Sequence, residues 1–187
     1  MRSLLAAAAV LLGCLLGPAA VADVPYAGAP VEAYSGYEPQ TTCTKKPKPG
    51  TVVLGEYLVS TYGGGGGAVN RDCTGTATSE HKDGRAIDWT LDATNPEDRA
   101  RAKQFLADAF ATDAQGNTDA LARRMGIMYL IWNDHMYSAY SGFEKEPYLS
   151  SSCRSRKKCS KTLRHRDHMH ISLSKAGARG LTSFYVG

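Results

Sequence analysis

Two short stretches of this chain, residues 79–89 and residues 165–170, constrain its fold more than any other feature. The first contains a histidine, two aspartates and a turn glycine, and the second contains three of the five histidines together with an aspartate. Imidazole nitrogens and carboxylate oxygens are groups that bind divalent metal ions. We therefore expect the rest of the chain to be a scaffold that brings the two stretches together around a metal.

The first stretch is predicted to fold as a hairpin. Its turn is Lys82-Asp83-Gly84, and Asp and Gly favour tight turns. Such a hairpin brings the His81 imidazole and the Asp88 carboxylate to one point. Because successive side chains of a strand point to opposite faces, Ile87 and Trp89 are expected in the core.

The second stretch leads into a predicted strand with His168 and His170 on one face and Met169 buried on the other. Together with His81 and Asp88 this makes four candidate ligands, whereas a catalytic zinc site uses three protein ligands and one water. One strand histidine is therefore expected to lie beside the metal without binding it. A single His or Asp is more often structural, and copper and iron also accept imidazole, so the residue types leave the metal open.

Asp167 directly precedes this predicted strand. Strict alternation would place its carboxylate on the face opposite His168. We therefore expect Asp167 on the loop that enters the strand, where it could act as a general base toward a metal-bound water.

The first 22 residues are predicted to be a secretory signal peptide. Arg2 precedes an apolar run over residues 4–16, and Ala20-Val21-Ala22 has the small residues of a cleavage site. The run is too short to span a bilayer. A lipid-attachment site at Cys14 is the alternative, but apolar residues follow Cys14 where a lipoprotein has a polar tether. We expect a secreted protein, extracellular or associated with the cell wall, without a membrane span.

The mature chain is predicted to have two parts. Residues 23–42 are rich in Pro, Ala, Gly and Tyr and contain no basic residue, which indicates a flexible leader whose tyrosines could pack on the domain. Residues 43–187 have the length of one domain. The net charge of +4 suits an anionic extracellular surface but is too small to indicate nucleic-acid binding. We expect a monomer.

Four cysteines remain after the signal peptide, namely Cys43, Cys73, Cys153 and Cys159. An even number in an exported protein predicts two disulfides, with three possible pairings. We prefer the pairing in chain order because it closes two separate loops. A zinc site built from all four is disfavoured, because no pair has the short spacing of a metal knuckle and the compartment is oxidising.

Periodicity and turn residues predict a mixed α+β domain with a small antiparallel sheet and flanking helices. The five glycines at 63–67 indicate a mobile loop. The predicted elements are a helix over 51–62 capped by Thr51, a helix beginning at Asn95, a helix over 119–125, a central strand over 127–132 and a strand over 170–174.

The motif Ser79-x-His81-x-x-Gly84-x-Ala86-x-Asp88, followed by Asp167-His168-Met169-His170, resembles the zinc D-alanyl-D-alanine peptidases of the lysostaphin/DD-peptidase/hedgehog superfamily. The sequence is most similar to a branch of secreted actinobacterial and fungal domains, through the motif around residues 79–86, Tyr129-x-Ile131-Trp132-Asn133 and Arg166-Asp167-His168-x-His170. The resemblance extends from Cys43 to the C-terminus and implies a hedgehog/DD-peptidase-like fold.

This resemblance implies a set of site residues. His81, Asp88 and His170 would hold zinc, with a water as the fourth ligand. Asp167 matches the acid that activates that water, and His168 matches the histidine that stabilises the oxyanion.

The resemblance also implies the activity. Relatives use an arginine upstream of the first ligand to orient the substrate, and Arg71 is the candidate here. The chain is then a zinc-dependent peptidase or amidase acting on the peptide stems of peptidoglycan. The alternative is a non-catalytic secreted binding domain that keeps a structural zinc. A metal-dependent nuclease is a third hypothesis, but it would require a more strongly basic groove.

Overall fold

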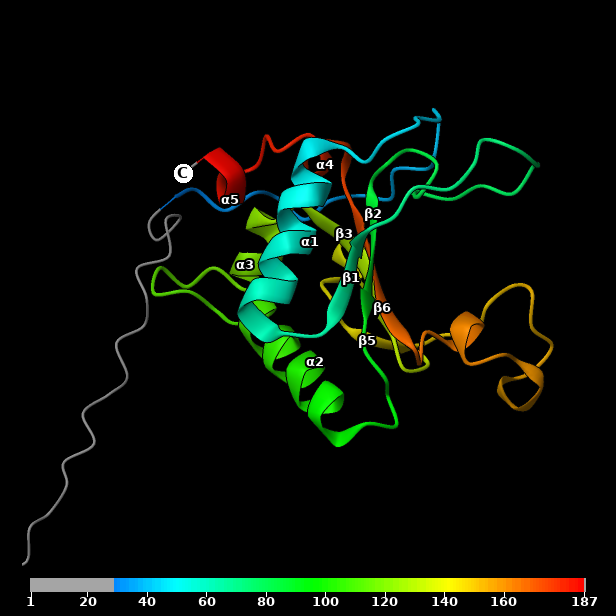
Figure 1. The fold of residues 1–187 in the computed structure, drawn as a ribbon. Helices are drawn as coiled ribbons and strands as arrows, with labels where there is room; N and C mark the ends of the chain where they lie inside the picture. Colours follow the sequence, from blue (N-terminus) through cyan, green and yellow to red (C-terminus); the bar gives the residue numbers. More distant parts are fainter. Residues whose placement is uncertain (1–28, 187) are drawn as a thin grey trace, which may run out of the picture.

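The computed structural model of this chain describes residues 29–186, and they form an α+β fold around one six-stranded antiparallel sheet (Figure 1). The strand order is β1-β2-β6-β3-β4-β5. The strands are β1 (Gly65–Ala68), β2 (Ala86–Thr90), β3 (Ile127–Trp132), β4 (His135–Ser138), β5 (Lys145–Pro147) and β6 (His168–Leu173). The helices are α1 (Pro49–Tyr62), α2 (Pro96–Ala109), α3 (Ala120–Arg124), α4 (Lys175–Ala178) and α5 (Ser183–Val186), with 3-10 turns η1 (Ala139–Ser141), η2 (Arg156–Lys158) and η3 (Thr162–Arg164). The predicted fold class is confirmed.

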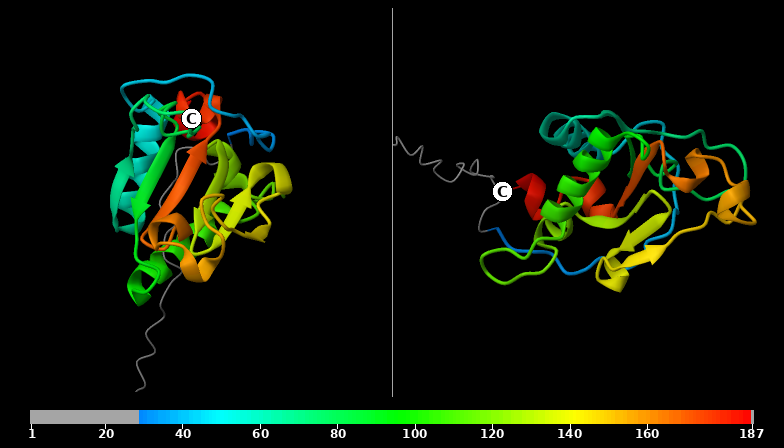
Figure 2. Two further views of the ribbon diagram at one scale, coloured as in Figure 1. Left: turned by 90° about the vertical axis from the view of Figure 1, so that its right-hand side faces the viewer. Right: turned by 90° about the horizontal axis from the view of Figure 1, so that it is seen from below.

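Strand β6, near the C-terminus, lies between β2 and β3 at the centre of the sheet (Figures 1 and 2). Its register places His170 directly opposite Asp88 of β2, and Ile171 opposite Ile87. On its other side, β3 is buried along its whole length, as predicted for a central strand. The late strand therefore joins the two halves of the sequence motif by backbone pairing.

Helices α1 and α2 cover one face of the sheet (Figure 1). The side chains between these layers are fully buried, and each large one contributes roughly 1.5–3 kcal/mol of burial free energy. They are Leu54, Leu58, Ile87, Trp89, Phe105, Met169 and Ile171. Since these residues alternate along β2 and β6 with Asp88, His168 and His170, the polar side chains of the motif lie on the opposite face.

The helix predicted to begin at Thr51 begins two residues earlier, at Pro49. Proline suits this position because its fixed φ matches the first helical turn and its missing N–H is not needed there. Thr51 is therefore not the cap. Its hydroxyl lies inside the first turn and donates a hydrogen bond of 2.9 Å to the carbonyl of Gly84, which ties α1 to the turn before β2.

The glycine run after α1 is not only a loop, because β1 uses three of its residues as an edge strand paired with β2. Gly66 shows why glycine is needed. Its φ is +77°, and a Cβ atom there would lie 2.4 Å from the carbonyl oxygen of Asp88. Any side chain would push the edge strand away from β2.

The helix predicted from Asn95 is confirmed as α2, since the Asn95 side chain accepts a hydrogen bond from the Glu97 backbone N–H. The predicted helix at 119–125 is shorter, with α3 covering Ala120–Arg124. Gly126 follows it with a φ of +68°.

Residues 29–42, which belong to the expected flexible leader, have no helix or strand but run along the domain and are bound to it. The hydroxyl of Tyr34 donates to the Asp119 carboxylate at 2.5 Å, and the Glu32 carboxylate accepts from both the N–H and the hydroxyl of Ser183. Further along, the carbonyl of Glu38 accepts from the buried Arg85 guanidinium. The rings of Tyr34 and Tyr37 contact those of Phe143 and Tyr140, so these tyrosines pack on the domain.

Both predicted disulfides are present, Cys43–Cys73 and Cys153–Cys159, with Cα atoms 5.8 and 5.4 Å apart. The pairing in chain order is therefore confirmed, and the sulfur atoms are not available for a zinc site. The predicted signal peptide, residues 1–22, and Cys14 lie outside the described residues. Within residues 29–186, no helix is long and apolar enough to cross a membrane.

Candidate metal centre

His81 lies in a turn over residues 80–84, not on the strand of a hairpin as predicted. Three backbone hydrogen bonds close this turn: Lys82 N–H to Ser79 O, Gly84 N–H to His81 O, and Arg85 N–H to Glu80 O. The strand that pairs with β2 on the side away from β6 is the glycine strand β1 instead. The turn still brings His81 beside Asp88, so the expected meeting of the two side chains occurs by a different local structure.

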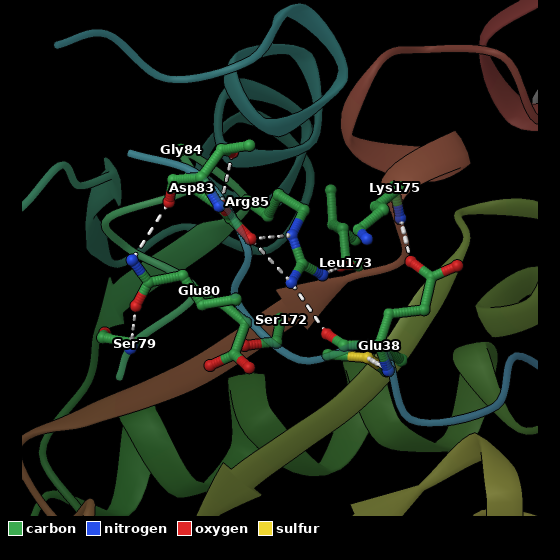
Figure 3. A network of polar contacts seen from close by, with 12 residues as sticks. Glu38, Ser79, Glu80, Asp83, Gly84, Arg85, Ser172, Leu173 and Lys175 are labelled. Carbon is green, nitrogen blue, oxygen red and sulfur yellow. Dashed lines mark hydrogen bonds and ion pairs between the residues drawn. The ribbon is translucent and has the colours of Figure 1, made fainter. Parts of the chain in front are cut away.

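A buried ion pair holds this turn in place (Figure 3). The Asp83 carboxylate accepts from the Arg85 Nε and Nη2 atoms at 3.1 and 3.0 Å. Arg85 Nη1 and Nη2 also donate to the carbonyls of Leu173 and Glu38, at 2.6 and 2.8 Å. One guanidinium therefore joins the turn, the end of β6 and the N-terminal segment.

The turn and the two central strands bring three possible ligand atoms together. His81 Nε2 lies 3.2 Å from Asp88 Oδ1, and His170 Nδ1 lies 3.1 Å from the same oxygen. The two imidazole nitrogens are 3.2 Å apart. This group of three residues could hold a metal ion.

The orientation of the His81 ring is set by the backbone. Its Nδ1 lies 2.8 Å from the carbonyl oxygen of Val69, which can only accept a hydrogen bond. Nδ1 therefore carries the hydrogen of the neutral ring, and Nε2 presents a lone pair toward Asp88 and His170. Fixing a ligand histidine through its second nitrogen is the usual arrangement in protein metal sites.

Both other members of the group favour the deprotonated form that a metal requires. Burial would raise the pKa of Asp88, but the adjacent His170 and His81 imidazoles lower it well below its ordinary value. Burial lowers the pKa of His170, and the nearby Asp88 only partly opposes this. A proton therefore competes weakly for these ligand atoms.

The spacing of the three atoms fits a tetrahedral metal. With bonds of about 2.0–2.1 Å to nitrogen and oxygen, the edges of a zinc tetrahedron are about 3.3–3.4 Å long. The three measured separations of 3.1–3.2 Å are close to that length. Without a cation, the lone pairs of His81 Nε2 and the Asp88 carboxylate would face each other at this distance.

His168 and Asp167 form a pair beside this group. Asp167 lies on the loop before β6, as expected, and its Oδ1 is 2.7 Å from His168 Nδ1. Its other oxygen accepts a hydrogen bond of 2.6 Å from the Thr162 hydroxyl. Burial would raise the pKa of Asp167, but the bonds from Thr162 and His168 lower it below its ordinary value. The second ring nitrogen, His168 Nε2, lies 3.7 Å from Asp88 Oδ1.

His165 also lies at this site, although the motif analysis gave it no role. Its ring centroid is 4.9 Å from that of His168 and 5.6 Å from that of His170. Its Nδ1 is buried without a hydrogen-bond partner among the described residues. Burial, followed by the charges of His170 and His168, lowers the pKa of His165 to about 3. Its place in the histidine-rich stretch was the only signal for it in the sequence.

Arg71, the predicted substrate-binding residue, is not joined to this group by a hydrogen bond or ion pair within residues 29–186. It is exposed and lines a cavity of about 440 Å³ together with Asn70, Cys73 and neighbouring residues. It follows Val69 by two positions, so its backbone is close in sequence to the carbonyl that binds His81.

The family model described as VldE, C-terminal domain, matches residues 43–154. The matched segment contains His81 and Asp88 and ends before Asp167 and His170. No curated protein and no solved structure matches the chain. Because the family match covers more than half of the sequence, this chain belongs to the VldE C-terminal domain family.

Proposed function

We propose that this protein is a secreted zinc-dependent hydrolase, a peptidase or amidase that acts on the peptide stems of peptidoglycan. The observation that carries the proposal is the convergence of His81, Asp88 and His170 beside the Asp167–His168 pair. The sequence resemblance to the zinc D-alanyl-D-alanine peptidases supports the same assignment. Under this proposal the fold is of the hedgehog/DD-peptidase type.

Zinc is the proposed metal because two imidazole nitrogens and one carboxylate oxygen are a usual set of three ligands at a catalytic zinc. When bound, zinc supplies Lewis-acid polarisation of a carbonyl oxygen and makes water more acidic. His81, Asp88 and His170 would hold it. Among residues 29–186 this group contains three ligands, the number at an open catalytic zinc site, whereas a closed structural site has four.

We assign proton transfer to His168 and orientation of that ring to Asp167. Each carboxylate oxygen of Asp167 accepts one hydrogen bond, one from His168 and one from Thr162, and these two bonds fix the carboxylate beside the His168 ring. The ionised carboxylate holds a hydrogen on His168 Nδ1, which leaves Nε2 free to accept a proton on the side of Asp88. The Asp167 charge stabilises the imidazolium that forms, and that imidazolium can donate to the developing oxyanion or to the leaving amine.

The location of the site supports an anionic polymer or peptide as substrate. The loop closed by Cys153–Cys159 and the loop around Cys73 project from the same side of the molecule, next to β6 and β2 (Figures 1 and 2). Within the first loop, Arg154, Lys157 and Lys158 are exposed. Secretion follows from the predicted signal peptide and agrees with the two disulfides. Arg71 remains the proposed residue for substrate orientation.

The test combines elemental analysis with digestion of intact peptidoglycan. Wild-type protein should contain one zinc per chain and release muropeptide fragments, whereas His81→Ala and His170→Ala should lose both the metal and the activity. His135→Ala is the matched control, because His135 lies on β4 and its ring hydrogen-bonds to the Asn133 carbonyl, outside the metal group. Wild-type protein without stoichiometric zinc, or hydrolysis that survives His170→Ala, would refute the proposal.

A non-catalytic binding domain with a structural metal is the second candidate. The burial of two ligands favours it, since His81 is 1% and His170 is 7% exposed. The variant Asp167→Ala separates the two functions. Loss of hydrolysis with unchanged zinc content supports the enzyme, whereas loss of thermal stability or partner binding, with no activity in either protein, supports the binding domain.

A further inference from the structure

A cavity of about 310 Å³ lies beside the turn over residues 80–84 but outside the metal group. Residues of the N-terminal segment, the turn, α4 and the chain just before α1 form its wall. The charged side chains that line it are four cations and one acid, namely Lys48, Arg85, Lys175, Arg179 and Asp83. None of the three candidate metal ligands lines it. The proposed reaction therefore gives this cavity no role.

The positive charge around this cavity is only partly neutralised by the protein. Asp83 and Arg85 form a buried ion pair, so together they add no net charge to the wall. The other three cations form no ion pair within residues 29–186. The carboxylate of Glu38 approaches Lys175, but it accepts a hydrogen bond from the backbone N–H of that residue rather than from its ammonium (Figure 3). Three cations that the described residues leave without an ion pair therefore border one concave surface.

Such an arrangement of like charges favours an anionic ligand. The three cations repel one another, and a concave surface with walls of low dielectric constant focuses their field into the cavity. An anion bound there would oppose this repulsion. It would also accept charge-assisted hydrogen bonds from several side chains at once, which are stronger than bonds between neutral groups.

The positions of the donors select the class of anion. Lys48 precedes α1, whereas Lys175 begins α4 and Arg179 directly follows it. The Arg179 Nε donates to the Lys175 carbonyl at 3.1 Å, which holds the guanidinium beside α4 and directs its Nη groups elsewhere. Donors from separate elements suit a tetrahedral phosphate, because its oxygens point in several directions while the two oxygens of a carboxylate lie in one plane.

The size of the cavity indicates that the ligand is larger than phosphate alone. Sites for small organic molecules have volumes of roughly 300–1,000 Å³, and this cavity lies at the lower end of that range. We propose that it binds a phosphorylated organic molecule, whose phosphate group is held by Lys48, Lys175 and Arg179. This site is separate from the proposed metal centre, although its buried wall is the ion pair that holds the metal-binding turn.

The first experiment maps the binding of inorganic phosphate and of glycerol 3-phosphate by amide NMR shifts. A chelator is present so that no bound metal attracts the anion, and chloride keeps the ionic strength constant. Both probes should give saturating shifts at Thr41, Lys48, Lys175 and Arg179, and glycerol 3-phosphate should bind more tightly. Shifts that do not saturate, or that centre on the basic loop over residues 154–158, would overturn the proposal.

The second experiment removes the cations one at a time, by Lys48→Gln, Lys175→Gln and Arg179→Gln. Each change should weaken the binding of glycerol 3-phosphate by about 2–5-fold, and the triple variant by about 10–100-fold. Lys46→Gln is the matched control, because it removes the same charge two residues from Lys48 but does not line the cavity. The control should bind like wild type, and a triple variant that also binds like wild type would refute the site.

Two further probes identify the chemical source of the phosphate group. Acetate tests the preference for phosphate, and binding of acetate as tight as that of inorganic phosphate would contradict it. Dimethyl phosphate has the charge of a phosphodiester within a polymer, whereas glycerol 3-phosphate is a monoester. Binding of both esters supports a phosphodiester polymer as the natural ligand, and binding of the monoester alone supports a small phosphorylated molecule. Because the chelated protein is used throughout, failure of the proposed hydrolase would not alter these results.

Discussion

Replacing Asp83 by asparagine measures how much stability depends on the ion pair that holds the metal-binding turn. Asp83 and Arg85 are each 2% exposed. One oxygen of Asp83 accepts from the backbone and hydroxyl of Thr42, at 2.9 and 2.6 Å, and the other accepts twice from Arg85. Asparagine keeps the shape of the side chain but removes the negative charge that faces a guanidinium, and a guanidinium stays protonated in proteins.

The expected loss of stability is large because, without the Asp83 charge, the remaining acceptors of Arg85 are two uncharged carbonyls, those of Leu173 and Glu38. Breaking a buried ion pair on one side lowers the free energy of unfolding by about 3–5 kcal/mol. For a domain of this size each kcal/mol lowers Tm by about 2–4 °C, so Asp83→Asn should lower Tm by about 6–20 °C.

The loss should also depend on pH in a fixed direction. Burial alone would raise the pKa of Asp83, but the hydrogen bonds from Thr42 and the bonds and charge of Arg85 outweigh it, so the pKa lies below its ordinary value of 3.8. A carboxylate with a lowered pKa contributes its full stabilisation above that ordinary value and loses it as pH falls through the folded-state pKa. The difference between wild type and variant should be greatest at pH 7 and shrink below about pH 4.

Urea denaturation at pH 7 and pH 3, with a chelator present throughout, tests both statements without any contribution from bound metal. Asp92→Asn is the control, because Asp92 forms a shorter ion pair with Lys161, at 2.6 Å, on the exposed surface. Exposed pairs contribute little to stability. The reasoning is refuted if Asp83→Asn destabilises no more than the control at pH 7, or if its effect is the same at both pH values.

Two further predictions concern the disulfides and His165. The Cys43–Cys73 bond closes a loop of 30 residues and the Cys153–Cys159 bond a loop of 6 residues. Replacing the first pair by serine should lower the free energy of unfolding by about 4 kcal/mol, and replacing the second pair should lower it by about 2 kcal/mol. Urea denaturation measures both losses, and a larger loss from the shorter loop would contradict the loop-entropy argument. In metal-free protein, the His165 pKa of about 3 lies below its ordinary value of 6.5. Between these two pH values the unfolded chain binds a proton at His165 that the folded chain does not bind. The free energy of unfolding therefore falls as the pH falls from 6.5 to about 3. His165→Phe should remove this loss, and identical pH profiles of Tm for the variant and wild type would count against it.

The parts of the site that obey a local rule could be predicted from the sequence. Alternation in the strands places Ile87 and Trp89 in the core, and the structure buries both completely. The same rule places Asp88 and His170 on the other face, where register then makes them neighbours. The positions of these strand residues follow from a period of two, which holds regardless of what the strands pair with.

The parts that depend on distant partners could not be predicted. The glycines of β1 have no strand propensity, and only the pairing with β2 makes them a strand. The residues around His81 predict a hairpin, but they suit both a hairpin and the turn over residues 80–84 that the structure contains. The carbonyl of Val69 orients His81, yet a backbone carbonyl has no sequence signal.

The bound N-terminal segment is a further case of this limit. Its richness in Pro, Ala, Gly and Tyr and its lack of basic residues indicate a flexible leader whose tyrosines could pack on the domain. The segment is held by polar bonds, such as those from Arg85 to the Glu38 carbonyl and from the Thr42 hydroxyl to Asp83, and by ring contacts of its tyrosines with Phe143 and Tyr140. Whether such bonds form depends on buried partners elsewhere in the chain, and a composition average contains no information about them.

The topology explains why the site needs both halves of the chain. The motif residues 79–89 position one imidazole and one carboxylate, but the third ligand arrives only when β6 enters the sheet between β2 and β3. That ligand also contacts β3, because the Tyr129 ring stacks on the His170 ring. Turn, β2, β6 and β3 must therefore all be in register before the three ligand atoms can meet. A metal bound there would contact the centre of the sheet, so its binding free energy would add to the stability of the whole domain and not only to that of one loop.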